Sequence, residues 1–189
     1  MNIIAPIDCN TGYGITGYNI CKNLFNIYNN LCVFPIGVAN VEADWDRNIL
    51  TQSILKNKIN FDHSKPCLKI WHDNDFFIRP YGKSKYGGLS FFEIDKISDI
   101  SKKSYSLLDI IFAPSQWAKD ILINNGISSN KIIVCPQGVD TEIFDNETPK
   151  DKNDTYVFIN IGKWEIRKGH DILPELFDNA FTNNSGSIS

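Results

Sequence analysis

The chain has 189 residues, which is enough for one domain of ordinary size with some residues left over. Hydrophobic residues make up 42% of it and charged residues 22%, so most of the length can form a covered core and is not intrinsically disordered. The 19 basic and 22 acidic residues give a formal net charge of −3, which argues against a protein that binds nucleic acid mainly through a basic surface.

Strand-like and helix-like segments alternate along the chain. In chain order, the first expected elements are a strand at residues 2–6, a polar loop from Asp8 to Gly14, a helix from Ile15, a strand at 31–36, a helix at 46–58 and a strand at 67–71. They are followed by a loop region at 79–90, a helix at 95–106, an apolar run at 107–113, a helix after Ser115 and a strand at 131–135. This alternation predicts an α/β fold, with a mainly parallel sheet and helices on both of its faces.

Local signals support the expected helices. From Ile15 onward, apolar residues recur at helical spacing and fall on one face. Ser115 has the residue type and the position of an N-cap for the helix that follows it. Gly126 suits the C-terminal cap of the same helix, because glycine adopts the left-handed conformation needed there.

The composition changes after residue 144. Residues 145–155 are rich in polar and charged side chains, which is typical of a linker between domains. A strand at 156–161, a loop at 162–169 and a helix at 172–181 are expected next, as in the opening strand–helix unit of a second sheet. We therefore expect a first domain at residues 1–144 and, after the linker, the incomplete start of a second domain at 156–189.

The cysteines exclude one class of small protein. There are five of them, at Cys9, Cys21, Cys32, Cys67 and Cys135, and no two form a C-x-x-C pair. This pattern argues against a disulfide scaffold and against a clustered zinc site, and it favours buried thiols.

No apolar run approaches the roughly 20 residues of a membrane-spanning helix. Since the first residues also lack the features of a signal peptide, we expect a cytoplasmic protein.

The loop after the first strand contains the pattern G-x-G-x-x-G at residues 12–17. Such a loop exposes backbone N–H groups at the start of a helix, where a phosphate is favoured. Two observations argue against a nicotinamide or flavin dinucleotide. Residues 8–11 separate the strand from the first glycine, and the acidic residue expected roughly 20 residues later is missing. Glycines that serve only to turn the chain are the alternative interpretation of this loop.

Residues 162–171, with the sequence G-K-W-E-I-R-K-G-H-D, form the second candidate site. The cations Lys163, Arg167 and Lys168 lie between a predicted strand and a predicted helix. Ligands of α/β folds bind at the carboxyl ends of strands, and lysines beside a helix N-terminus suit a diphosphate. A solvated basic turn, in which Glu165 partly neutralises Arg167, is the other interpretation.

Four segments occur in a characteristic order: T-G-Y-G at residues 11–14, D-I-I-F-A-P-S-Q-W at 109–117, P-Q-G-V-D at 136–140 with Phe144, and the basic loop at 162–171. Together they resemble the family-4 glycosyltransferases of the GT-B fold. The resemblance spans most of the chain. It is specific for the superfamily and identifies neither a donor nor an acceptor.

The resemblance implies two Rossmann-like domains that face a cleft, with a nucleotide-sugar donor bound mainly by the C-terminal one. Lys163 and Lys168 match the basic pair that holds the donor diphosphate. The first is commonly arginine in the family, so Lys163 offers a point charge in place of a planar fork. The loop around Gly12 and Gly14 would approach the donor phosphates or the acceptor from the other domain. His72 matches a histidine near the transferred sugar and is the candidate catalytic residue, with a capping or structural histidine as the alternative.

The chemistry implied by the resemblance is transfer with retention at the anomeric carbon. Charge grows on the diphosphate leaving group, and the two lysines would stabilise it electrostatically. The resemblance therefore implies no metal and no cofactor, since the nucleotide-sugar is a co-substrate. The D-x-D triplets at 44–46 and 73–75 are interpreted as surface or loop acids, and the role of Glu93 stays open.

The expected partners are a nucleotide-sugar and a glycan, lipid or protein acceptor, with no nucleic acid and no transmembrane segment. A full family member continues for about another domain and carries an acidic E-x7-E segment that binds the donor. This sequence has no such segment, so we expect the chain to be inactive, or nearly so, unless it pairs with a separate C-terminal half. A non-catalytic module that binds an acceptor or a partner is the alternative. A small nucleotide-dependent oxidoreductase is a third interpretation, which the missing ribose-binding acid disfavours.

Overall fold

The computed structural model describes residues 1–28, 30–41, 62–77, 84–141, 144 and 156–181. The chain forms two compact units, Met1–Val139 and Asp140–Ser189, and each is described by itself. The predicted helix at 46–58 and the predicted linker at 145–155 lie outside the described residues.

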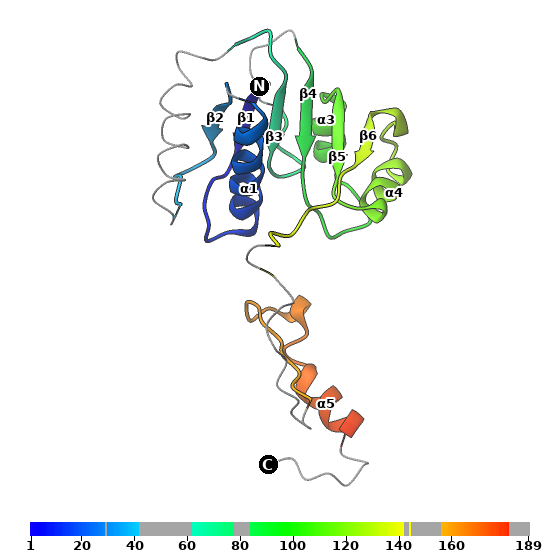
Figure 1. The fold of residues 1–189 in the computed structure, drawn as a ribbon. Coiled ribbons are helices and arrows are strands. Elements are labelled where there is room, and N and C mark those ends of the chain that lie inside the picture. The colour runs from blue at the N-terminus through cyan, green and yellow to red at the C-terminus, as the bar shows by residue number, and fades with distance from the viewer. Residues whose placement is uncertain (29, 42–61, 78–83, 142–143, 145–155, 182–189) are drawn as a thin grey trace. The chain divides into compact units, whose positions relative to one another are not determined.

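Six strands of the first unit form one parallel sheet in the order β2-β1-β3-β4-β5-β6 (Figure 1). Their bounds are β1 (Asn2–Ala5), β2 (Cys32–Pro35), β3 (Cys67–Ile70), β4 (Tyr86–Leu89), β5 (Ile110–Ala113) and β6 (Ile132–Val134). The α/β fold that the sequence predicts, a Rossmann-like parallel sheet with helices, is confirmed.

The strand order reverses at β1, because β2 lies on one side of it and β3 lies on the other. Connections between parallel strands are right-handed, so the direction of travel along the sheet fixes the face on which each connecting helix lies. Helix α1 (Gly12–Ile27) connects β1 to β2 and lies on one face of the sheet (Figure 1). Helices α3 (Asp99–Ser106) and α4 (Gln116–Asn124) connect β4 to β5 and β5 to β6, which follow one another in the opposite direction along the sheet. Both helices lie on the opposite face.

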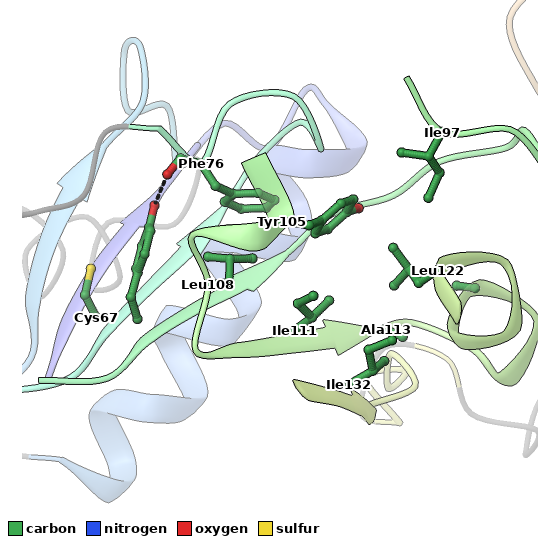
Figure 2. Packing of buried hydrophobic residues seen from close by; sticks show 11 residues of the cluster. Cys67, Phe76, Ile97, Tyr105, Leu108, Ile111, Ala113, Leu122 and Ile132 are labelled. Atoms are coloured by element: carbon green, nitrogen blue, oxygen red, sulfur yellow. Dashed lines mark hydrogen bonds between the residues drawn. The ribbon is translucent and has the colours of Figure 1, made fainter. Parts of the chain in front are cut away.

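Each face of the sheet has its own hydrophobic core, because successive side chains of a strand point to opposite faces. The core under α1 combines buried residues of four strands with one residue of the helix: Ile3, Ala5, Val33, Leu68, Ile70, Leu89 and Cys21. The core on the other face, shown in Figure 2, joins β5 to α3 and α4: Ile111, Ala113, Tyr105, Ala118 and Leu122.

The loop predicted at residues 79–90 is wrong for Tyr86–Leu89, which form the buried strand β4. Its two glycines, Gly87 and Gly88, suggest a loop when only local sequence is considered. A Cβ at Gly88 would lie 2.5 Å from Leu108 Cδ1 and 2.8 Å from Phe76 Cε1. The missing side chains therefore make room for large neighbours against a central strand.

Capping side chains set two helix boundaries that differ from the prediction. Helix α1 begins at Gly12, so the predicted loop ends at Thr11, whose hydroxyl accepts a hydrogen bond from the Gly14 N–H (3.1 Å). Helix α3 begins at Asp99 and not at residue 95, because Ser98 provides the N-cap hydroxyl. In both cases the helix starts where a hydroxyl satisfies an N–H group of the first turn.

Both predicted end signals of α4 are confirmed. The Ser115 hydroxyl accepts a hydrogen bond from the Ala118 N–H (3.1 Å). Gly126 follows the last turn with a positive φ of 91°, which favours glycine because it has no Cβ.

In the second unit, helix α5 (Leu173–Phe181) confirms the predicted helix, whereas residues 156–161 form no strand. A strand is defined by hydrogen bonds to a neighbouring strand, and the described part of this unit contains none. The segment packs on α5 instead, where the Phe158 ring lies 5.7 Å from that of Phe177 and 5.5 Å from that of Phe181. Its β-prone residues therefore remain largely exposed.

Thiol reactivity offers a test of the two cores. Burial raises the pKa of both Cys21 and Cys67 to about 12, whereas Cys135, directly after β6, is exposed. Because the thiolate is the reactive form, we expect iodoacetamide at pH 8 to modify Cys135 in the native chain and the two buried cysteines only after denaturation. Mass spectrometry of the digested chain measures this order. Modification of Cys21 as fast as Cys135 would contradict the core under α1.

Candidate functional site

The carboxyl ends of β1 and β3 lie side by side at the point where the strand order reverses. Ligands of open α/β sheets bind outside the carboxyl ends of the strands at such a switch point. The loop after β1 leads into α1 through Gly12 and Gly14, and His72 follows closely after β3. The fold thus brings the predicted glycine loop and the predicted histidine to the same edge of the sheet.

Short-range hydrogen bonds fix the loop after β1. The Thr11 N–H donates to the Asp8 carbonyl (3.1 Å), and Asp8 Oδ1 accepts from the Asn10 N–H (3.1 Å). Gly14 packs directly on this turn, since a Cβ there would overlap the Asp8 carbonyl oxygen and lie 2.6 Å from the Asp8 nitrogen. A Cβ at Gly12 would meet no atom within 4 Å. Gly14 is therefore required for packing, whereas Gly12 leaves the start of α1 uncovered.

Tyr13, between these two glycines, connects the ends of three strands. Its hydroxyl accepts a hydrogen bond from the Phe91 N–H (2.9 Å) and donates one to the Phe91 carbonyl (3.1 Å). Its ring centroid lies 5.1 Å from that of His72 and 5.7 Å from that of Trp71. The Phe91 ring is also in contact, with centroids 5.1 Å apart. We call Tyr13, Trp71, His72 and Phe91 the edge cluster.

His72 is exposed, but the loop that carries it is anchored. The Asp75 N–H donates to the His72 carbonyl (3.1 Å), and the Asp75 carboxylate lies 3.4 Å from Nζ of the buried Lys69. The next residue is held as well, because the Phe76 N–H donates to Ser104 Oγ (2.7 Å). His72 therefore presents an imidazole to solvent from a fixed backbone, as contact with a ligand requires.

The P-Q-G-V-D segment reaches the same edge of the sheet. The Gln137 side-chain amide donates a hydrogen bond to Thr16 Oγ1 in α1 (2.9 Å), although the two residues are 121 positions apart. The Thr16 hydroxyl in turn donates to the Gly12 carbonyl (3.0 Å). This contact joins the segment after β6 to the start of α1.

Two carboxylates, those of Asp73 and Glu93, act on the Tyr13 phenol at this edge. Burial raises the pKa of Tyr13, and the nearby carboxylates of Asp73 and Glu93 raise it further. Burial also raises the pKa of Tyr105, whose hydroxyl contacts that of Ser90, and the same Asp73 adds to the effect. Both phenols stay protonated at neutral pH.

The second unit contains the basic loop. Lys163 and Lys168 are exposed, and the Lys168 stem lies beside Gly162, where a Cβ would be 3.9 Å from the Cγ and Cδ atoms of Lys168. The Glu165 carboxylate accepts a hydrogen bond from Arg167 Nε (2.8 Å), as the sequence suggests. In the part of this unit that the structure describes, no acid pairs with either lysine. The loop therefore offers two ammonium groups to an anion.

The two D-x-D triplets are not supported as a metal site. The triplet at 44–46 lies outside the described residues, and Asp75 of the other triplet pairs with Lys69. Among the residues that the structure describes, no group of three or more His, Cys, Asp or Glu side chains could hold a metal ion.

The structure brings Gly12, Gly14 and His72 together, while Lys163 and Lys168 share a loop of the other unit. The contacts of Tyr13, Trp71 and Phe91 are absent from the prediction. The only signal for them in the sequence is an aromatic residue just after two of the strands and in the glycine loop, which is not specific.

Comparison with known proteins found no matching family model, no matching curated protein and no matching solved structure. None of the helices in the described ranges is long and apolar enough to cross a membrane.

Proposed function

We propose that the chain provides the acceptor-side domain and a diphosphate-binding loop of a retaining glycosyltransferase that uses a nucleotide-sugar. The observation that carries this proposal is the contact of Tyr13, in the first turn of α1, with the exposed His72 at the switch point of the sheet (5.1 Å between ring centroids). The resemblance of the glycine loop, the P-Q-G-V-D segment and the basic loop to family-4 glycosyltransferases supports it.

The first unit is assigned to the acceptor. The edge cluster offers aromatic rings, which pack against the apolar face of a sugar, and the exposed imidazole of His72 beside them. Asp73 and Glu93, which act on the Tyr13 phenol from nearby, would accept hydrogen bonds from sugar hydroxyls and repel a phosphate. We therefore assign a hydroxyl-bearing acceptor to this edge, and the donor phosphates to the lysines of the other unit.

The second unit is assigned to the donor diphosphate. Negative charge grows on the diphosphate when its bond to the anomeric carbon breaks. Fixed cations at that position stabilise the transition state more than the ground state. Lys163 and Lys168 would act in this way, and Arg167 would contribute less because Glu165 already binds it.

Nucleotide binding tests the assignment of the two lysines. Lys163→Ala and Lys168→Ala are each expected to weaken the binding of UDP, GDP or ADP by about tenfold or more, because a hydrogen bond to a charged group is lost. Isothermal titration calorimetry with the three nucleoside diphosphates measures the affinity. The control is Lys103→Ala, which removes an exposed lysine of α3 in the first unit and should leave the affinity unchanged.

The alternative function, a non-catalytic acceptor- or partner-binding module, predicts a different result. The unaltered chain would then bind none of the three diphosphates, and all three lysine variants would behave alike.

A further inference from the structure

Both ring nitrogens of His170, near the end of the basic loop, have hydrogen-bond partners within the second unit. Nδ1 lies 3.1 Å from the side-chain nitrogen of Asn160, and Nε2 lies 2.9 Å from the Lys163 carbonyl oxygen. An amide nitrogen only donates, so Nδ1 accepts from Asn160. The ring proton must then be on Nε2, which donates it to the Lys163 carbonyl. One histidine thereby joins the beginning of the loop to its end.

Further contacts close the loop around this histidine. The Trp164 ring stacks on the His170 ring, with centroids 5.0 Å apart and planes at 8°. The Lys168 N–H donates to the Glu165 carbonyl (2.9 Å), and Gly169, with φ of 73°, turns the chain toward α5. A Cβ at Gly162 would lie 3.8 Å from His170 Nε2 and 3.9 Å from the Lys168 stem. Lys163 thus leaves the backbone next to a carbonyl that bonds the His170 ring, and the Lys168 stem lies beside Gly162 at the start of the loop.

We propose that His170 is the positioning residue of the basic loop, and that it sets the placement of Lys163 for a diphosphate. The inference rests on the proposed function, because it takes the ligand of the two lysines from there. A lysine is a point charge on a flexible stem and lacks the rigid fork of arginine, so its placement depends on the backbone that carries it. The bond from Nε2 to the Lys163 carbonyl fixes that backbone before the ligand arrives, which reduces the entropy lost on binding.

His170 itself is not assigned to the ligand or to proton transfer. Both of its nitrogens already have partners within the chain, and one face of its ring is covered by Trp164. His170 would therefore change the affinity for an anion only by fixing the position of Lys163.

Pyrophosphate binding by matched variants tests the inference. His170→Phe keeps an aromatic ring for Trp164 and removes both hydrogen bonds, so we expect an affinity for inorganic pyrophosphate about tenfold lower. His170→Gln places an amide donor near the position of Nε2 and is expected to restore most of the affinity. His63→Gln, an exposed histidine of the first unit, is the control and should have no effect. Lys163→Ala in the same titration shows whether the loop binds the probe at all.

Three results are distinguishable. Weaker binding by His170→Phe, with rescue by His170→Gln, supports the positioning role. Loss of binding in Lys163→Ala but not in His170→Phe overturns the role of His170 and leaves the proposed function in place. If Lys163→Ala binds pyrophosphate as well as the unaltered chain does, the assignment of the diphosphate to this loop is wrong. The inference about His170 then fails with it.

The hydrogen bonds of His170 are also measurable without any ligand. The ¹⁵N chemical shifts of its ring should show the Nε2–H tautomer at pH 8 in the unaltered chain. In Asn160→Ala, which removes the donor to Nδ1 but keeps the Lys163 carbonyl as acceptor, the Nε2–H tautomer should persist. An Nδ1–H tautomer in the unaltered chain would overturn the bond to the Lys163 carbonyl on which the inference depends.

Discussion

Replacing Gly14 with alanine is expected to lower the free energy of unfolding by about 3 kcal/mol, because the new Cβ would overlap backbone atoms of Asp8. Side chains can rotate away from such an overlap, but this turn is fixed by the hydrogen bonds of Asp8 with Thr11 and Asn10. Either α1 or the turn must move, and both belong to the edge where His72 and Tyr13 meet. Urea denaturation followed by circular dichroism measures the loss of stability.

Gly12→Ala is the matched control for this prediction. Both glycines lie in the first turn of α1, yet a Cβ at Gly12 meets open space. Alanine also restricts the unfolded chain more than glycine does, so Gly12→Ala should leave the stability unchanged or raise it by up to about 1 kcal/mol. Equal destabilisation by the two substitutions would mean that α1 does not pack on the Asp8 turn as described.

The regular part of the fold follows from patterns that extend over a few residues. Apolar runs gave the positions of five of the six strands, and Ser115 and Gly126 marked the ends of α4 correctly. Strand β4 could not be predicted in this way. Its Gly87 and Gly88 are explained by Phe112, Leu108 and Phe76, which fill the space beside them and are distant in the sequence.

The candidate site was only partly predictable for the same reason. Gly12, Gly14 and His72 could be named from local motifs, but the hydrogen bonds of Tyr13 with Phe91 connect residues 78 positions apart. Nothing within the glycine loop itself indicates such a partner. The bond between Gln137 and Thr16 is longer in range still, and both contacts depend on the order of strands in the sheet.

Residues 156–161 show that a local pattern can also predict an element that does not form. Their composition is typical of a strand, and the described part of the second unit nevertheless has no strand there. Side-chain preference describes a residue's fit to a sheet, whereas a strand also needs backbone partners. A β-prone segment such as this one therefore forms a strand only where a neighbouring strand offers its backbone N–H and C=O groups.

Replacing Phe76 with alanine is expected to cost about 3–5 kcal/mol of stability, because a large and fully buried side chain leaves a cavity. The Phe76 ring packs against that of Tyr105, with centroids 5.7 Å apart (Figure 2). It also fills the space beside Gly88, where a Cβ would lie 2.8 Å from Phe76 Cε1. Its carbonyl accepts a hydrogen bond from the Tyr86 hydroxyl (3.3 Å), so the residue links the loop after β3 to β4 and α3. Thermal and urea denaturation of the variant measure the loss.

Phe77→Ala is the matched control, because the neighbouring phenylalanine is 49% exposed and should cost far less on truncation. The pair also tests the site, since the backbone of Phe76 anchors the loop that presents His72. Under native conditions, hydrogen exchange of the Asp75 and Phe76 amides should become faster in Phe76→Ala and stay unchanged in Phe77→Ala. Equal effects of the two substitutions would show that the loop after β3 does not depend on the core for its position. His72 would then lack the fixed backbone that its proposed role requires.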